Sequence, residues 1–294
     1  MDHLHPSYRD KALLPAEERI AWMWSERWIG YPQGQLVLDH MSALLRRPKV
    51  HRASNMLIVG RSNNGKSTLM REFCYRNEAV CEDDTDGVRA PVVLIEAPEV
   101  PDAKRLYYNI LDAIGSPVRS SYHVTKSARQ VKELFVQMGV RVLIVDEIHN
   151  LLHAGHHKLF TFGNLLKTMT NTMGFTFVFV GTKEAKAVLR AMPQLGSRFK
   201  SFVLPQWQMD EDYFRLLDTF ESIIPLRQPS RLSDPALALD ILQRAEGLFG
   251  EILDLLYTAA EKAILNGQES ITPDLLNSLG WESPSDRHRE TLDE

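Results

Sequence analysis

Two clusters of residues have the types and spacing that nucleotide chemistry requires, and the first is the run Gly60–Ser67. It fits the pattern G-x-x-x-x-G-K-[ST] of a phosphate-binding loop (P-loop). The glycines let the backbone curl so that successive N–H groups face one anion. Lys66 adds a positive charge for the β- and γ-phosphates, and Ser67 offers a hydroxyl to Mg²⁺. The predicted nucleotide-binding residues are Gly60, Arg61, Ser62, Asn63, Asn64, Gly65, Lys66, Ser67 and Thr68.

The sequence on both sides of this loop supports the prediction. Residues 54–59 form an apolar run that is typical of a buried strand, and Leu69, Met70 and Phe73 follow at helical spacing. A strand, a glycine loop and a helix in this order distinguish a nucleotide site from an ordinary glycine turn. The helix is expected to begin near Gly65 and to direct its positive end toward the phosphates.

The second cluster is the acidic pair Asp146 and Glu147, which follows the apolar run 142–145. A P-loop ATPase needs such a pair, because Asp146 would hold Mg²⁺ together with Ser67 and Glu147 would polarise the attacking water. The alternative is a solvated turn. The position of the pair, at the end of a strand about 80 residues after the P-loop, favours the catalytic interpretation.

Two further residues complete the predicted catalytic set of Lys66, Glu147, Thr182 and Arg198. Thr182 follows the apolar run 175–180, where it could sense the γ-phosphate or cap the helix that begins next to it. Arg198 precedes a short apolar segment, and an arginine supplied there to a neighbouring subunit can be worth about 10³–10⁵ in rate. Arg190 is the second choice, and a plain surface arginine is the alternative.

The acidic pair also begins the sequence Asp-Glu-Ile-His, which spells the DExH box of helicases. A second motor domain, which a helicase would need, is not found in the 294 residues. His149 and His153 lie four apart and would share one face of a helix, so a metal site is a further alternative. No third ligand stands at a convincing spacing, which makes this alternative weak.

Composition limits the classes of partner. The net charge is −4, whereas general polyanion binders are usually basic, so any nucleic-acid surface must be a local patch. The two cysteines suggest neither a disulfide framework nor a zinc site, which indicates a reducing compartment. No apolar run is long enough to span a membrane and no signal peptide is recognisable, so we expect a cytoplasmic protein without membrane contact.

The order of the elements predicts an α/β fold. Apolar runs at 54–59, 91–96, 140–145 and 175–180, with a shorter one at 202–204, alternate with helical patterns. This order predicts a parallel sheet with helices on both faces. Residues 1–15 are expected to be irregular, with a helix after them that packs on the main domain. The expected domains are an N-terminal helical extension (1–50), a nucleotide-binding domain (51–229), a helical lid (230–282) and a disordered tail (283–294).

Taken together, these motifs resemble the AAA+ ATPases, and more specifically the TniB family of ATP-binding transposition proteins, with a looser similarity to TnsC and MuB. The most specific matching stretches are SNNGKS at 62–67, DEIHNLL at 146–152 and L-P-x-W at 204–207. The similarity extends over roughly residues 17–280. One departure stands out: many AAA+ proteins carry an arginine at the start of a lid helix, but residues 250–254 contain acids and no arginine.

The resemblance implies a Mg²⁺-dependent ATPase, slow or stimulated by a partner, that assembles on double-stranded DNA as a ring or helical filament. Such proteins recruit and activate a DDE-type transposase (TniA/TnsB-like), commonly with a TniQ-type adaptor. Related ATPases line their DNA-facing channel with the segment between the second and third strands. The candidate DNA contacts there are Lys104, Arg105, Arg119, Lys126 and Arg129, with His123 beside them. A solvated charged face is the alternative for each one.

Two other functions fit the same motifs. One is a helicase-loader-like AAA+ remodeller, whose ATPase activity would respond to protein rather than to DNA. The other is a scaffold that binds ATP without significant turnover, which the missing lid arginine favours and the intact Glu147 opposes.

Overall fold

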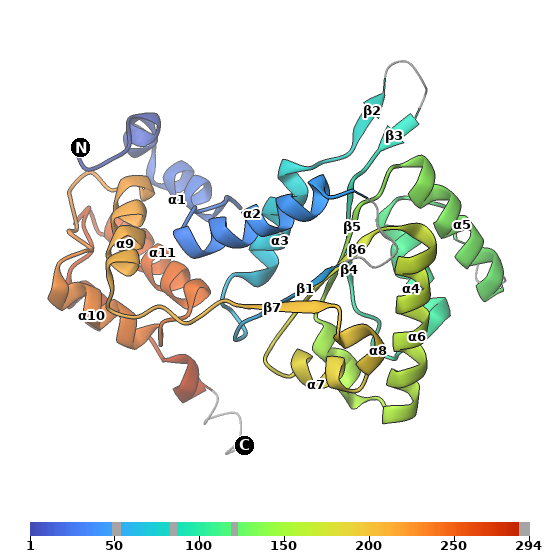
Figure 1. Cartoon of the computed structure of the whole chain (residues 1–294). Helices are drawn as coiled ribbons and strands as arrows, with labels where there is room; N and C mark the ends of the chain where they lie inside the picture. Colours follow the sequence, from blue (N-terminus) through green and yellow to red (C-terminus); the bar gives the residue numbers. More distant parts are fainter. Residues whose placement is uncertain (49–53, 83–86, 119–122, 288–294) are drawn as a thin grey trace. The chain divides into compact units, whose positions relative to one another are not determined.

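The computed structural model describes residues 1–48, 54–82, 87–118 and 123–287 (Figure 1). Contacts between residues divide the chain into two compact units, which we describe separately. The sheet unit contains Gln33–Ser62 and Lys66–Leu204. The helical unit contains Met1–Pro32, Pro205–Glu294 and a short insertion, Asn63–Gly65, from the P-loop.

A five-stranded parallel sheet forms the centre of the sheet unit, in the order β4-β5-β6-β1-β7. The strands are β1 (Asn55–Val59), β4 (Val92–Glu96), β5 (Val142–Asp146), β6 (Thr176–Gly181) and β7 (Phe199–Val203). Because all pairs are parallel, the carboxyl ends of the strands meet at one edge. At this edge the P-loop follows β1, Thr182 follows β6, and the acidic pair consists of the last residue of β5 and the residue after it.

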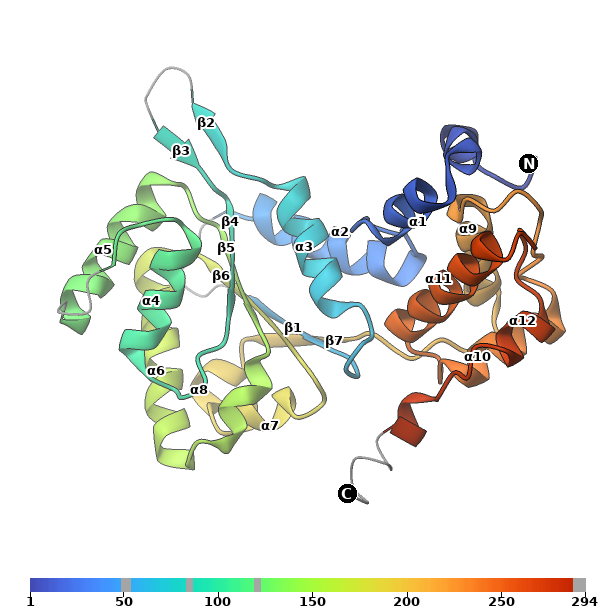
Figure 2. The same ribbon diagram turned by 180° about the vertical axis from the view of Figure 1, so that it is seen from behind.

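Helices cover both faces of the sheet, as the sequence predicted (Figures 1 and 2). One face is covered by α2 (Pro32–Arg46) and α3 (Lys66–Arg76), and the other by α4 (Ala103–Ala113), α5 (Val124–Gln137), α6 (His156–Met173), α7 (Ala185–Arg190) and α8 (Pro193–Gly196). Strand side chains alternate between the faces. Leu57, Val59, Leu143 and Phe177 therefore share one core with the helices α4 to α7, and burial on both faces explains the unbroken apolar runs.

Three features of the sheet unit differ from the sequence prediction. An antiparallel hairpin of β2 (Val80–Glu82) and β3 (Gly87–Arg89) was not predicted. The last strand was expected at 202–204 but begins three residues earlier, at Phe199. A short 3₁₀ helix, η2 (Ile148–His153), follows the acidic pair.

The helical unit is built from η1 (Pro6–Leu13), α1 (Ala16–Trp24), α9 (Glu211–Ile223), α10 (Pro235–Arg244), α11 (Phe249–Leu265) and α12 (Pro273–Asn277). Side chains of Asp210, Asp234 and Thr272 cap α9, α10 and α12 by accepting backbone N–H bonds. The 3₁₀ helix η1 corrects the expectation that residues 1–15 are irregular throughout, and α9 was not predicted.

The core of the helical unit joins the N-terminal segment to the C-terminal helices. Met23, Ile29 and Tyr31 are buried in it, and the Tyr31 ring lies 5.5 Å from the Trp207 ring and 5.2 Å from the Phe249 ring. The N-terminal helix was expected to pack on the main domain; within the helical unit it packs on α11 and η1. All five tryptophans of the chain, at positions 22, 24, 28, 207 and 281, belong to this unit.

The contact-based units and the sequence-based domains are different divisions of the chain, and the boundaries expected at residues 50, 229 and 282 stay predictions. Of the tail expected to be disordered, residues 284–287 form a helical turn, while residues 288–294 lie outside the described part. None of the described helices combines the length and apolar character that a membrane-spanning segment needs.

Candidate nucleotide site

The P-loop leaves the sheet at Gly60, directly after β1. Its N–H donates to the carbonyl oxygen of Gly181 on β6 at 3.2 Å. A Cβ atom at Gly60 would lie 3.3 Å from the Leu204 Cβ and 3.4 Å from the Lys66 side chain. A side chain here would crowd both neighbours, because the backbone passes closely between the end of β7 and the lysine that follows in the loop.

The tip of the loop turns through two residues in the left-handed region, Asn63 with φ 56° and Gly65 with φ 73°. Asparagine and glycine tolerate this conformation better than other residues do. The tip belongs to the helical unit, where a Cβ atom at Gly65 would lie 3.1 Å from the Phe249 ring. The two left-handed positions let the backbone curl as the P-loop pattern predicts.

Lys66, the first residue of α3, is 5% exposed, and its Nζ donates to the carbonyl oxygen of Arg61 at 2.7 Å. Burial lowers the pKa of Lys66, and the carboxylates of Glu147 and Asp146 oppose that shift. The ammonium group is thus desolvated and lies over the loop. It can exchange its carbonyl partner for a phosphate oxygen, which is a stronger acceptor.

The next residue, Ser67, donates its hydroxyl to Oδ2 of Asp146 at 2.7 Å, and Oδ1 of Asp146 accepts the N–H of Glu147 at 2.8 Å. The structure thus brings together the two residues predicted to bind Mg²⁺. A hydroxyl and a carboxylate are oxygen ligands of the kind that Mg²⁺ prefers, so this pair fits the ion. Thr68 follows as an exposed residue in the first turn of α3.

Glu147 has a left-handed backbone, with φ 54° and ψ 33°, and its Oε2 lies 3.2 Å from Nε2 of His149. Nδ1 of the same imidazole accepts the N–H of Thr182 at 3.4 Å. Since a backbone N–H can only donate, Nδ1 carries no proton, and the proton of the neutral ring is on Nε2, the atom that faces the Glu147 carboxylate. A Cβ atom at Gly181 would lie 3.0 Å from Nδ1, so this glycine gives the ring its space.

His149 is a functional candidate that the predicted site residues do not include, because the sequence supports neither a metal site nor a helicase box there. The structure shows it between Glu147 and Thr182. Among the described residues, no group of three or more histidines, cysteines and acids could hold a metal ion. The alternative role of Thr182 as a helix cap is not seen, because the N-cap residue of α7 is Glu184.

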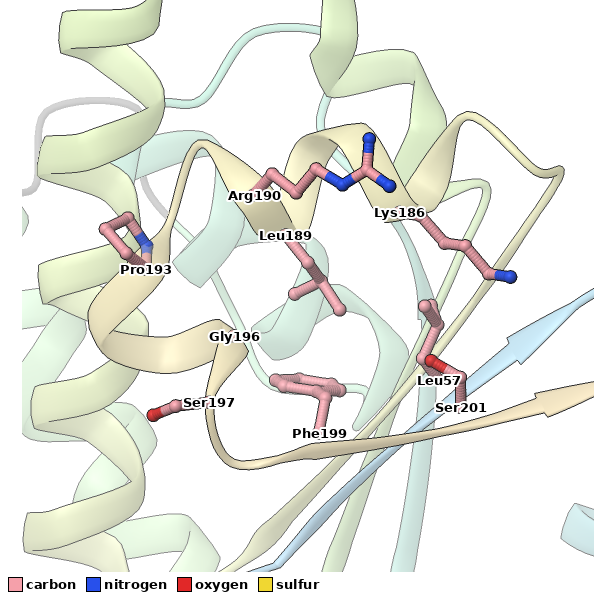
Figure 3. A pocket seen from close by; sticks show the side chains of 9 residues that line it. All are labelled: Leu57, Lys186, Leu189, Arg190, Pro193, Gly196, Ser197, Phe199 and Ser201. Carbon is pink, nitrogen blue, oxygen red and sulfur yellow. The ribbon is translucent and has the colours of Figure 1, made fainter.

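The two arginine candidates lie near the start of β7. Nη1 of Arg198 donates to Oδ1 of Asn171 at 2.8 Å. Arg190, at the end of α7, lines an open pocket of about 440 Å³ with Lys186, Leu189 and Phe199 (Figure 3). Figure 3 shows Leu189 directed toward the Phe199 ring, with the two cations extending from the same helix. A role toward the nucleotide of a neighbouring subunit stays a prediction for both arginines.

The candidate DNA contacts lie on α4 and α5, two helices that pack against each other. Arg105 pairs with Glu99 at 3.3 Å and Arg129 with Glu133 at 2.8 Å, both on the surface. Lys104 Nζ lies 5.5 Å from the centre of the Tyr108 ring, and Lys126 is exposed on α5. Arg119 lies outside the described residues.

Solved structures with the same fold include two archaeal proteins. The Aeropyrum pernix ORC2 protein (ADPNP-ADP complexes) has a TM-score of 0.62 and 18% identity, covering 87% of this chain and 70% of that chain. Cdc6p from Pyrobaculum aerophilum has a TM-score of 0.59 and 18% identity, covering 86% of this chain and 68% of that chain. At these identities the similarity shows the fold, which is that of AAA+ proteins.

A third similar structure is the Aeropyrum pernix ORC1 protein in complex with DNA, with a TM-score of 0.51 and 17% identity, covering 84% of this chain and 63% of that chain. A search of curated proteins finds no match. The family described as bacterial TniB protein matches residues 19–209, which include the P-loop, the acidic pair, Thr182 and Trp207. The chain therefore belongs to the bacterial TniB family, a group of AAA+ ATPases associated with transposition.

Proposed function

We propose that this protein is an ATP-dependent regulator of transposition that assembles on double-stranded target DNA and recruits and activates a DDE-type transposase. The observation that carries the proposal is the convergence of Lys66, Ser67, Asp146 and Glu147 beside the P-loop of a TniB-family chain. Family membership implies ATP binding and hydrolysis. Assembly on DNA, the TniA/TnsB-like transposase and the TniQ-type adaptor are the parts that we infer.

ATP binding would use the residues at the carboxyl ends of β1 and β5. The backbone N–H groups of the P-loop and the Lys66 ammonium group would bind the β- and γ-phosphates. Ser67 and Asp146 would hold Mg²⁺ through their oxygens or through water, and the ion would neutralise phosphate charge. The ADPNP-ADP complexes of the similar ORC2 protein support this assignment of the substrate class.

Hydrolysis would depend on Glu147. Its carboxylate would orient a water molecule and accept its proton as the water oxygen bonds to the γ-phosphorus and the bond to the β,γ-bridging oxygen breaks. ADP then leaves with that oxygen. His149 holds the carboxylate on one side and the Thr182 backbone on the other, so the base is linked to the loop after β6. Arg198 of a neighbouring subunit, or Arg190, would stabilise the charge that develops on the γ-phosphate.

DNA binding would use the cations of α4 and α5. Their surface ion pairs are worth little, typically about 0–1 kcal/mol each, so they can be exchanged for phosphate contacts. One or two such contacts per subunit, repeated along a ring or filament, would give strong and salt-dependent binding although the net charge of the chain is −4. The ORC1 complex with DNA supports this capacity of the fold.

Sedimentation of the purified protein with duplex DNA tests the proposal, with ATP, a slowly hydrolysed ATP analogue and ADP compared side by side. Large DNA-bound assemblies are expected with the analogue and not with ADP. Small particles in every nucleotide, without bound DNA, would contradict the proposal and favour the helicase-loader-like or scaffold alternatives.

The variant Glu147→Gln sharpens this experiment. It keeps the shape of the side chain but removes the base, so ATP hydrolysis is expected to fall at least about 100-fold while DNA-bound assemblies persist in ATP. Lys66→Ala should abolish both ATP binding and assembly. Glu211→Gln, on the exposed surface of α9, is the matched control and should behave like the unmodified protein.

A further inference from the structure

The tip of the P-loop is held by the first turn of α11, which is where many AAA+ proteins carry a lid arginine. Asn63, Asn64 and Gly65 belong to the helical unit, and four backbone or side-chain bonds connect the two asparagines to that unit. The remaining residues of the loop belong to the sheet unit. The conformation of the loop tip is therefore determined by contacts within the helical unit.

Asn63 contributes two of these bonds. Its carbonyl oxygen accepts the N–H of Gly250 at 2.9 Å, and its Nδ2 donates to Oε1 of Glu251 at 2.8 Å. Glu251 is 5% exposed although it carries a carboxylate. Burial of a carboxylate costs free energy unless the group is hydrogen-bonded and paired with an opposite charge. The bond from Asn63 therefore helps to stabilise Glu251 in its buried position.

Gly250 makes the arrangement possible. A Cβ atom at this position would collide with the Cγ, Oδ1 and Nδ2 atoms of Asn63. The Asn63 side chain therefore lies directly against the backbone of α11, and any larger residue at 250 would displace it.

Asn64 contributes the other two bonds. Its Oδ1 accepts the N–H of Phe249 at 3.3 Å, and its Nδ2 donates to the carbonyl oxygen of Pro205 at 3.0 Å. The N–H groups of Phe249 and Gly250 belong to the first turn of α11, where backbone donors lack partners within the helix. The asparagines of the P-loop satisfy them, and in return the helix fixes the loop.

The charge of Glu251 is balanced by Arg287, from the helical turn at residues 284–287. Nη2 of Arg287 contacts Oε2 of Glu251, and the guanidinium lies 5.8 Å from the centre of the Trp281 ring. The segment is anchored at two further points. Nε1 of Trp281 donates to the carbonyl oxygen of Arg244 at 3.2 Å, and the N–H of Ser285 donates to Oε1 of Glu246 at 2.8 Å.

We propose that Glu251 and Gly250 are positioning residues for the phosphate-binding loop, and that Arg287 makes ATP affinity dependent on the C-terminal segment. Glu251 holds Asn63 in the left-handed conformation that the loop needs. Arg287 cancels a carboxylate charge that would otherwise repel the phosphates. The start of α11 thus acts on the nucleotide through the P-loop, and not through a lid arginine. This inference rests on the proposed ATP function and deepens it.

Three single variants test the inference by calorimetric measurement of ATP and ADP affinity. Gly250→Ala displaces Asn63, and Asn63→Gly removes its side chain but tolerates the left-handed backbone. Both are expected to weaken ATP binding about tenfold, because a hydrogen bond to a charged group is removed. Arg287→Gln leaves the Glu251 charge unpaired and should weaken ATP binding more than ADP binding, since ATP carries more negative charge.

A charge rescue separates this positioning role from a general loss of folding. The double variant Glu251→Gln with Arg287→Gln removes both charges, while a glutamine can still accept a bond from Asn63. It should bind ATP more tightly than Arg287→Gln alone. The matched controls are Gly30→Ala, whose Cβ would meet its nearest neighbour at 3.6 Å, and Arg215→Gln, from an exposed ion pair of α9. Both controls should bind ATP as the unmodified protein does.

The outcomes distinguish this inference from the proposed function. If the unmodified protein binds ATP, Lys66→Ala does not, and the three single variants bind like the controls, the positioning role is wrong while the ATP function stands. If the unmodified protein binds no ATP, amide hydrogen exchange measured without nucleotide tests whether the asparagines hold the first turn of α11. The amides of Phe249 and Gly250 should then exchange faster in Asn63→Gly and Gly250→Ala than in Gly30→Ala, and equal exchange would overturn the inference.

Discussion

At the scale of single residues, His149 is the group that links Glu147, the base in our proposal, to the rest of the sheet. Its imidazole lies between the carboxylate that follows β5 and the backbone that follows β6. The left-handed backbone of Glu147 is costly for a non-glycine residue, and such strain is typical of functional sites. The imidazole contact helps to hold the strained residue in one orientation.

Replacement of His149 by alanine is expected to lower kcat for ATP hydrolysis by about 10- to 100-fold, because the base loses the donor that orients it. The dissociation constant for ATP should change less than about twofold, since the phosphate-binding residues are untouched. Steady-state kinetics combined with calorimetry measures the two effects separately. His153→Ala, an exposed position in the same 3₁₀ helix, serves as the control. Equal reductions in kcat and affinity would argue against an orienting role.

The sequence predicted the site residues to different degrees, for a physical reason. Lys66 and Ser67 form a local pattern, and their chemistry can be read without knowledge of the fold. To predict the roles of Asp146 and Glu147, one further assumption is needed: the strands that precede the P-loop and the acidic pair end at the same edge of a parallel sheet. The contact of Asn63 with Glu251 joins residues 188 positions apart and has no local signature, so it could not be predicted.

At the scale of elements, α1 is fixed to the helical unit by a buried ion pair. Arg19 donates two bonds to Glu269, at 2.8 and 2.7 Å, and one to the carbonyl oxygen of Pro225 at 3.2 Å. The side chains are only 3% and 10% exposed. Glu269 also accepts the N–H of Arg227 at 3.2 Å. This network ties the N-terminal helix to the segments that precede α10 and α12.

Replacement of Arg19 by methionine keeps the volume but leaves Glu269 buried without its main partner. Unfolding in urea at pH 7 should show a loss of about 3–5 kcal/mol. The control Arg9→Met breaks an exposed pair with Asp2 and should cost less than about 1 kcal/mol. A cost for Arg19→Met as small as that of the control would mean that the buried pair does not hold α1.

The same pair predicts a dependence on pH. Burial alone would raise the pKa of Glu269, but the hydrogen bonds from Arg19 and from the N–H of Arg227 outweigh it and lower the pKa from its ordinary value. A pKa that is lower in the folded state gives stability that is present above the unfolded value and is lost as the pH falls through the folded value. The difference in unfolding free energy between the unmodified protein and Arg19→Met should therefore be full at pH 7 and shrink as the pH falls below the ordinary pKa of a glutamate.

Most elements could be predicted because their apolar patterns are long and regular. The strands β1, β5 and β6 are largely apolar and almost completely buried, and the edge strand β4 is also apolar except for its last residue. The hairpin β2–β3 could not be predicted, since its strands have three residues each, pair with each other and leave Val80 and Val88 exposed. The helix α9 has a readable pattern, in which the buried Tyr213, Leu216, Leu217 and Phe220 follow the capping Asp210 at helical spacing.

At the scale of the whole molecule, composition and surface have to be considered together. A net charge of −4 argues against binding DNA through general attraction, yet α4 and α5 carry cations on exposed positions. Polyelectrolyte binding depends on the phosphates that each subunit contacts and not on the total charge. DNA affinity is therefore expected to come from this local patch and to depend on assembly.

The combined variant Lys126→Ala with Arg129→Ala tests that expectation. If both residues bind phosphates, the slope of log affinity against log salt should fall by about 0.9 for each phosphate that a subunit no longer neutralises, or about two in total. The slope is obtained from the affinity for duplexes of different sequence, measured at several salt concentrations in the presence of the ATP analogue. Arg215→Ala with Arg231→Ala removes the same charge from the helical unit and should leave the slope unchanged. Equal slopes in the two double variants would exclude this patch.

The placement of the tryptophans has a practical consequence. All five belong to the helical unit, and the described part of the sheet unit contains tyrosines but no tryptophan. Excitation at the long-wavelength edge of the indole absorption band, where tyrosine absorbs little, therefore selects tryptophan fluorescence from one unit of the chain. That unit includes the loop tip Asn63–Gly65, and its Trp207 ring adjoins Tyr31, which packs on Phe249. The protein thus carries a built-in optical reporter of the helical unit, which can be read during nucleotide titrations without any label.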